Sequence, residues 1–280
     1  MILTADSTAA RTANRRRTGN GWNTAFVGKN RNTLPPGEAP PESGTLYPVA
    51  FLVEKDAGAV VRPHFHEADQ FQVVVQGGGR LGRHDIGTVA VHYTDAWSAY
   101  GPIVAAEEGV SWFTLRNTWD PGAKYMPGAR SELRAARAHH QHRERTTPPL
   151  APLSRAELAR LAAVDRTTEM ETPDGMASWR FRLPGAGAAT GPDPGNGGGQ
   201  FWLVLAGHAS CGGSAPLPGE SCVFVGPGEG ALAISAGPDG AELLCVQFPR
   251  AVRPARDKPD SGVRVVPAPT VSAALLPDAT

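Results

Sequence analysis

The apolar positions in the first half of the chain fall into short runs. These runs are rich in β-branched and aromatic residues and are bounded by Gly, Pro, Asn or Asp, which is typical of strands joined by turns. They are TLYPVAFLVE (45–54), FQVVVQG (71–77), GTVAVHY (87–93) and GVSWFTLRN (109–117). Their regular spacing predicts an antiparallel sandwich or barrel.

The middle of the chain has a different pattern. The segments 131–145 and 154–166 have the composition of helices, and the second opens with Ser154 and Glu157, which have the spacing of a capping box. A proline-rich stretch between the segments indicates a stiff connector. Three histidines lie in the first segment, namely His139, His140 and His142. We interpret them as a solvated helix end and not as a metal site, since no acidic residue stands nearby.

The last part of the chain resembles the first. FQVVVQG (71–77) and FWLVLAG (201–207) both begin with phenylalanine and end with glycine, so that position 201 corresponds to position 71. SWFTLRN and AELLCVQF follow at similar distances, which favours a duplicated barrel unit. The glycine-rich stretch 185–199 is expected to be a flexible loop. It lacks the strand, the helix and the lysine that a phosphate-binding loop requires.

The predicted architecture is mainly β, with two barrels and a short helical connector. The segments are a flexible N-terminal arm (1–21), an N-terminal barrel (22–127), a helical linker (128–177), a C-terminal barrel (178–250) and a tail (251–280). The arginines near the N-terminus follow a polar stretch, so they do not form a signal peptide and belong to the expected arm.

Composition narrows the classes of function. The 280 residues contain 27 Lys and Arg against 27 Asp and Glu, which argues against nucleic acid and membranes as partners. No apolar run approaches the ~20 residues of a membrane span. Three widely spaced cysteines form no disulfide framework, so a reducing cytoplasm is the expected location. Much alanine, glycine, proline and arginine suggests a GC-rich bacterial gene of specialised metabolism.

The candidate chemistry lies in GAVVRPHFHEADQFQVVVQGG (58–78). His64 and His66 are two residues apart, so on a strand they point to the same face. A turn after them brings Gln70 back toward the two imidazoles, and Gln72 follows on the same side of the next strand. Buried amides and imidazoles need partners, which indicates a deliberately polar barrel interior.

The spacing of these residues resembles the first motif of the cupin superfamily. Gly58, the His64-x-His66 pair, Gln70 and Gly77 match its spacing, but glutamine stands where the family has glutamate. The resemblance implies two jelly-roll barrels in one chain, a bicupin. It also implies that His64, His66 and Gln70 hold a divalent metal, Fe, Ni, Zn or Mn. Glutamine is a neutral, weaker ligand, so the alternative is a polar pocket without a metal.

The second cupin motif is degenerate in this chain. Its proline–glycine pair is missing, and the position of its histidine ligand falls near Trp97. His84 and His92 are both candidates to replace that ligand, and the sequence leaves the choice open. The C-terminal barrel has no histidine pair, so we expect it to be free of metal. It would support the first barrel or form the contact of a homodimer.

The leading hypothesis is an enzyme that acts on a small organic substrate inside the N-terminal barrel. The resemblance implies oxygenase, isomerase or cyclase-like chemistry, with the metal as Lewis acid or oxygen carrier. His92 is the candidate general acid or base, because its ordinary pKa is ~6.5. Gln72, Trp97 and Tyr100 are the candidate substrate-binding residues. The alternatives are a metal-free cupin that guides a cyclisation or isomerisation by shape and hydrogen bonds, and a binding protein without turnover.

Overall fold

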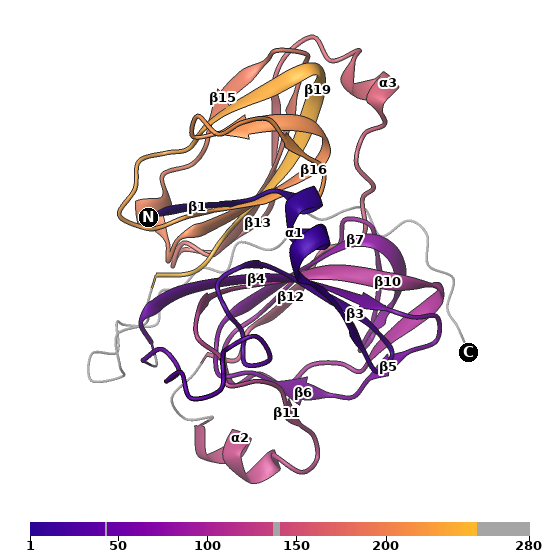
Figure 1. Ribbon diagram of the computed structural model, residues 1–280, viewed down its shortest axis with the longest axis vertical. Coiled ribbons are helices and arrows are strands. Elements are labelled where there is room, and N and C mark those ends of the chain that lie inside the picture. The colour runs from indigo at the N-terminus through magenta and orange to yellow at the C-terminus, as the bar shows by residue number, and fades with distance from the viewer. Residues whose placement is uncertain (43, 137–140, 251–280) are drawn as a thin grey trace.

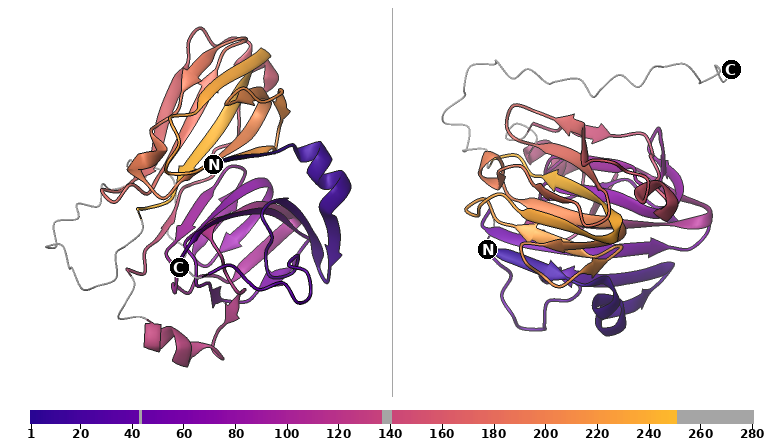
Figure 2. Two further views of the ribbon diagram at one scale, coloured as in Figure 1. Left: turned by 60° about the vertical axis from the view of Figure 1, so that its left-hand side comes forward. Right: turned by 90° about the horizontal axis from the view of Figure 1, so that it is seen from above.

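The computed structural model describes residues 1–42, 44–136 and 141–250. Two β-barrels of antiparallel strands are stacked on each other, with the C-terminal barrel above the N-terminal barrel in Figure 1. Figure 2 shows the same stack from two other sides. The expected two-barrel, mainly β architecture is therefore confirmed. None of the helices in the described ranges has the length and apolar character of a membrane-spanning segment.

The N-terminal barrel is built on one sheet with the order β12-β9-β7-β10-β4-β3-β2. Two short strands, β5 and β8, pair with β10 and β7, and β6 pairs with β11 in a separate ribbon. The bounds are β2 (Arg15–Thr18), β3 (Gly21–Val27), β4 (Leu46–Lys55), β5 (Val60–Val61), β6 (His64–Phe65), β7 (Gln70–Leu81), β8 (His84–Gly87), β9 (Val91–Thr94), β10 (Ile103–Thr118), β11 (Lys124–Tyr125) and β12 (Glu144–Thr146).

The C-terminal barrel has the order β1-β18-β16-β19-β14-β13, with β15 on β19 and β17 on β16. Its bounds are β1 (Ile2–Ala5), β13 (Asp165–Glu171), β14 (Ala177–Leu183), β15 (Ala188–Thr190), β16 (Gln200–Cys211), β17 (Leu217–Pro218), β18 (Cys222–Val225) and β19 (Ala233–Gln247). The helices are α1 (Ser7–Asn14), α2 (Arg130–Ala136), α3 (Arg155–Leu158) and the 3-10 turn η2 (Pro194–Asn196).

The structure corrects three expectations about the segments. The N-terminal segment 1–21 is not a flexible arm, because β1 pairs with β18 of the C-terminal barrel and β2 pairs with β3 of the N-terminal barrel. The segment 128–177 is only partly a linker, because β12 and β13 are barrel strands. The glycine-rich stretch 185–199 is packed and contains β15 and η2. Here glycine is required by close approach, since a Cβ at Gly197 would lie 2.5 Å from Gln247 Cγ.

The expected helices are shorter than their composition suggests. The first is α2. His139 and His140, which follow it, lie outside the described residues, and so does the expected tail 251–280. The second, α3, is a single turn, because the chain enters strand β13 at Asp165. The capping box is present as expected, with the Ser154 hydroxyl accepting from the Glu157 amide and the Glu157 carboxylate accepting from the Ser154 amide.

The two barrels share one apolar core. Alternate residues of β7, such as Phe71 and Val73, point out of the N-terminal barrel and pack with Phe201 and Leu203 of β16. The Phe71 and Phe248 ring centroids are 5.2 Å apart. Burial of these faces stabilises the stack, at ~25 cal/mol for each Å² of apolar surface removed from water. The opposite faces of β7 and β16 point into their own barrels.

The interiors of the two barrels differ in chemistry. Gln72 of β7 stands opposite Thr114 of β10, whereas Trp202 of β16 stands opposite Cys245 of β19. Trp202 and Cys245 belong to an apolar cluster that fills the C-terminal barrel. The repeat is visible in β7 and β16, both 12 residues long and beginning at Gln70 and Gln200. Thus the same framework is filled by apolar side chains in one barrel and lined by polar ones in the other.

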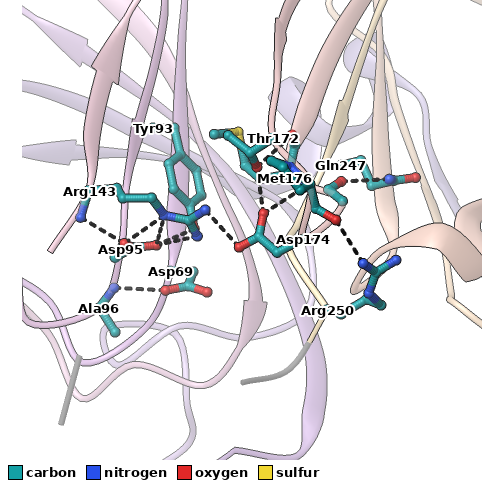
Figure 3. A network of polar contacts seen from close by, with 12 residues as sticks. Asp69, Tyr93, Asp95, Ala96, Arg143, Thr172, Asp174, Met176, Gln247 and Arg250 are labelled. Atoms are coloured by element: carbon teal, nitrogen blue, oxygen red, sulfur yellow. Dashed lines mark hydrogen bonds and ion pairs between the residues drawn. The ribbon is translucent and has the colours of Figure 1, made fainter. Parts of the chain in front are cut away.

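A polar network also connects the two barrels (Figure 3). Arg143 donates from Nε to Asp95 Oδ2 at 3.0 Å, and its Nη1 lies 2.7 Å from Asp174 Oδ2, in the turn between β13 and β14. Tyr93 donates its hydroxyl to Asp95 at 2.7 Å. Asp69 lies beside Asp95 and accepts from the Ala96 amide at 2.8 Å. Asp95 and Asp174 thus pair with one guanidinium, and Asp69 lies close enough for its charge to interact with Asp95 and Arg143.

Candidate functional site

A cavity of about 590 Å³ opens into the N-terminal barrel. Its walls come from β3, β4, β6, β7 and β10 and from the loop before β11. The lining residues that can do chemistry are His64, His66, Gln70, Gln72, Tyr100, Thr114, Arg116 and Asp120. The structure therefore brings the three expected metal ligands together, along with the expected substrate-binding residues Gln72 and Tyr100.

The backbone fixes the two histidines at the start of this site. Short strand β6 carries His64, whose amide and carbonyl both pair with Tyr100 at 3.1 and 3.0 Å. The imidazoles of His64 and His66 are almost perpendicular, with ring centroids 5.1 Å apart. Both side chains are buried, as the alternation of a strand that faces a barrel interior requires.

Hydrogen bonds set the tautomer of each imidazole. His64 Nδ1 lies 2.8 Å from the Arg62 carbonyl oxygen, and His66 Nδ1 lies 2.8 Å from Asp120 Oδ2. Both partners accept, so each Nδ1 carries the proton and each Nε2 keeps a lone pair. Burial, then repulsion from Arg116, lowers the pKa of His66 to about 3, and burial also lowers that of His64. Both imidazoles are therefore neutral at physiological pH.

Asp120 is the anion at the base of the site. It accepts from the amides of Glu67 and Gly122, both at 2.9 Å, and its Oδ2 lies 2.9 Å from Arg116 Nη1. Burial by itself would raise the pKa of this carboxyl. The charge of Arg116 and the hydrogen bond from His66 outweigh burial and hold that pKa well below its usual range. Asp120 is therefore ionised and is positioned to stabilise a proton on His66.

Arg116 fixes the orientation of the Gln70 side-chain amide. The guanidinium donates from Nε and Nη2 to Gln70 Oε1, at 3.2 and 2.9 Å. Arginine cannot accept, so Gln70 must present its oxygen to Arg116 and its amino group to Tyr100. The Tyr100 oxygen accepts this bond, which leaves its hydroxyl hydrogen for a ligand in the cavity. Burial raises the pKa of Tyr100 above its ordinary value, so the hydroxyl stays protonated.

These residues do not fit a divalent metal ion. The oxygen of Gln70, the third expected ligand, is already committed to a cation, and that cation adds positive charge where a metal would need negative charge. Two imidazole nitrogens remain, fewer than the three or four protein ligands of zinc sites and without the carboxylate of the 2-His-1-carboxylate set of non-haem iron. Within the ranges that the structure describes, no group of three His, Cys, Asp or Glu side chains converges on one point.

The other site residues predicted from the sequence lie outside the main cavity. His92 is buried behind Tyr100, with ring centroids 5.2 Å apart, and lines a separate cavity of about 10 Å³. His84 lies on β8 and lines neither cavity. Trp97 lines another depression, formed with α2, outside the barrel cavity. The roles assigned to His92, Gln72, Trp97 and Tyr100 stay predictions.

Sequence reasoning missed Arg116 and Asp120. A usable signal was present in SWFTLRN, where Trp112, Thr114 and Arg116 alternate on the face that meets Gln72 and Val74. An arginine on the inward face of a barrel strand is costly unless it is paired. Arg116 therefore needed a buried carboxylate as its partner, but the sequence alone does not indicate which one.

The comparisons with known proteins agree with this architecture. No protein-family model matches the chain, and no curated protein sequence matches it. Among solved structures, it is similar to a bacterial pirin from Escherichia coli in complex with nickel(II), with a TM-score of 0.53 and 12% identity over 89% of this chain and 100% of that one. It is also similar to a putative dioxygenase from Nostoc punctiforme, with a TM-score of 0.54 and 12% identity over 95% and 86% of the two chains.

A third similar structure is an oxalate decarboxylase from Lactobacillus farciminis in complex with formate. Its TM-score is 0.54, with 12% identity over 89% of this chain and 86% of that one. Pirins and oxalate decarboxylases are cupin-superfamily proteins, so the expected resemblance is confirmed at the level of the fold. Identities this low show the fold alone.

Proposed function

We propose that this cupin-fold chain binds a small organic molecule in its N-terminal barrel and moves a proton on it without a metal ion. The observation that carries the proposal is the double hydrogen bond from Arg116 to Gln70 Oε1. It removes a metal ligand and at the same time orients Gln70 and Tyr100 toward a ligand. A metal-free isomerase-like enzyme makes use of the tyrosine, the arginine and the aspartate of this cavity together with its two histidines.

His66 is the proton acceptor in this proposal. Its Nε2 lone pair is available because the pKa of His66 is lowered to about 3, and Asp120, which accepts from Nδ1 at 2.8 Å, offsets part of the cost that burial and Arg116 impose on the imidazolium. The acceptor would take a proton from a carbon next to a substrate carbonyl and return it to another atom of the substrate. His64 has the same tautomer but only a carbonyl behind it, so it is better suited to accept a hydrogen bond.

Tyr100 would stabilise the negative charge that develops on the substrate oxygen. Its hydroxyl hydrogen is free of Gln70 and its ring lies 6.5 Å from that of His66, measured between centroids. A donor fixed in place before the reaction needs no reorganisation, which makes this kind of stabilisation effective. Arg116 positions Tyr100 through Gln70 and therefore acts as a positioning residue.

The test is elemental analysis of the purified full-length chain, as isolated and after incubation with Fe(II), Mn(II), Ni(II) and Zn(II) followed by gel filtration. We expect well below one ion per chain in every case. The double variant Gln70→Glu/Arg116→Leu restores a carboxylate and removes the guanidinium, so it should gain about one ion per chain. Its matched control is Gln76→Glu/Arg80→Leu, which makes the same changes elsewhere on β7.

A stoichiometric ion in the wild-type protein that disappears in His64→Ala would refute the metal-free function. The proton-transfer step has its own readout once a substrate is found. His66→Ala and Asp120→Asn should then lower kcat by about 10²–10⁴-fold, the usual contribution of a general base. Tyr100→Phe should lower kcat more than it raises KM, because its bond strengthens only as charge develops.

A further inference from the structure

The walls of the N-terminal cavity carry an excess of positive charge. Arg31, Lys55, Arg62 and Arg116 line it, against the single carboxylate of Asp120. Arg116 is paired with Asp120 at 2.9 Å. In the described part of the chain, no carboxylate lies within ion-pair distance of the other three cations. The residues that line the cavity therefore carry about three more positive than negative charges when both histidines are neutral.

The direct contacts of these three cations are with neutral groups. Lys55 Nζ donates to Asn20 Oδ1 at 2.7 Å, and Arg31 Nη1 donates to the Pro121 carbonyl at 3.4 Å. The Arg62 guanidinium lies 4.9 Å from the centre of the Tyr125 ring. None of these contacts is an ion pair, and Asp56 acts on Lys55 only through its longer-range charge, so each guanidinium or ammonium group retains attraction for an anion that enters the cavity.

A second, smaller cavity adjoins the main one. The smaller cavity of about 10 Å³ shares Gln72, Ile103 and Trp112 with the main cavity. Two of its polar atoms, Gln72 Oε1 and His92 Nε2, are buried and have no hydrogen-bond partner among the residues that the structure describes. Gln72 and His92 face each other across β7 and β9, and the two residues are 5% and 2% exposed.

Unpartnered buried polar atoms are costly, at roughly 1–3 kcal/mol each, and therefore require an explanation. The small cavity has room for one water molecule or one group of similar size. Gln72 Oε1 can only accept, so the group it lacks is a hydrogen-bond donor. His92 Nδ1 contacts the Thr146 hydroxyl at 2.9 Å, which leaves Nε2 facing the same space.

We propose that the substrate is a small organic anion that also carries a hydroxyl or amino group. The anionic group is attracted by Arg31, Lys55 and Arg62, and the donor group is recognised by Gln72 Oε1 beside His92. This inference rests on the proposed function, because it assigns the chemical class of the molecule that enters the same cavity. It assigns Gln72 and the three cations to recognition, separate from proton transfer at His66.

The probe is 3-(4-hydroxyphenyl)propanoate, which has one carboxylate and one donor on a flexible link. Its two matched analogues are 3-(4-hydroxyphenyl)propanamide, which lacks the charge, and 3-phenylpropanoate, which lacks the donor. Binding to the full-length protein is measured by titration calorimetry at pH 7.5 and low ionic strength. We expect the probe to bind at least 10-fold more tightly than either analogue, and its affinity to fall when salt is added.

Variants separate the two parts of the recognition. Arg31→Gln/Arg62→Gln should weaken the probe at least 10-fold and leave the amide unchanged. Gln72→Leu should abolish the preference for the probe over 3-phenylpropanoate. The control is Arg80→Gln, which removes an exposed cation from β7 outside the cavity and should change neither affinity.

The inference is overturned if the amide binds as tightly as the acid, or if no carboxylate probe binds. It is also overturned if Gln72→Leu retains the preference for the hydroxyl. Any of these results leaves the metal-free function standing as long as the elemental analysis finds no ion. Conversely, a stoichiometric ion together with selective binding of the probe would refute the metal-free function and support the substrate class.

Discussion

Replacing Asp69 by Asn is expected to stabilise the protein, and more so as the pH rises. In the network of Figure 3, Asp69 and Asp95 share the neighbourhood of Arg143 with Asp174. Burial, then repulsion from Asp95, raises the pKa of Asp69 from 3.8 to about 6. The Ala96 amide and Arg143 oppose this rise only in part. The folded protein therefore holds the Asp69 proton more tightly than the unfolded chain does.

The sign and size of the effect follow from linkage. A carboxyl whose pKa is raised on folding costs nothing below pH 3.8, where it is protonated in both states, and costs most above pH 6. At ~1.4 kcal/mol for each tenfold change, the full cost is ~1.6 kcal/mol at pH 5 and ~3 kcal/mol at pH 8. Asp69 is only half-buried, so solvent screens part of its charge. We therefore expect Asp69→Asn to gain about 1 kcal/mol at pH 5 and about 2 kcal/mol at pH 8.

The assay is urea unfolding followed by tryptophan fluorescence at pH 5, 6, 7 and 8. Asparagine keeps an oxygen that can accept from the Ala96 amide, and Asp95 and Asp174 remain to balance Arg143. Asp85→Asn is the control, because it removes the same charge from a side chain that is 83% exposed and should show no comparable gain. A gain that does not grow between pH 5 and pH 8, or a less stable variant at pH 8, would refute this account of the network.

Three further outcomes follow from the packing of the barrels. Trp202→Ala should destabilise the protein by about 3–5 kcal/mol, because it leaves a large cavity in the filled barrel. Gln72→Ala in the open barrel should cost under about 1.5 kcal/mol in the same urea assay. Equal losses of stability would contradict the contrast between the two interiors. Gly207→Ala should lower the free energy of unfolding by at least about 2 kcal/mol, since φ is +71° and a Cβ would lie 2.2 Å from the Gly240 oxygen. An unchanged Tm in thermal unfolding would contradict this prediction. Burial raises the pKa of the Cys222 and Cys245 thiols, so neither should react with a thiol reagent at pH 8 until the protein is unfolded in urea; rapid labelling of the native protein would show the packing to be wrong.

The local sequence pattern determines much of the two-barrel fold. Short alternating runs determine the strands, the repeat of FQVVVQG as FWLVLAG determines that there are two barrels, and the spacing of His64 and His66 places both imidazoles on one inward face. The capping box at Ser154 is equally local. Periodicity is sufficient for the strands, the histidine pair and the cap because each depends on residues within one element or one turn, and the second barrel repeats the pattern of the first.

Only the tertiary structure decided the chemistry of the site. Arg116 meets Gln70 across 46 residues, and Asp120 meets His66 across 54. These contacts depend on the register between β7 and β10 and on the path of the loop after β10, which no local pattern encodes. The ordered N-terminal segment is a similar case, because β1 is a strand only through its pairing with β18, which belongs to the opposite end of the described chain. A barrel closes by joining distant segments, so its interior charges find their partners only once the chain has folded.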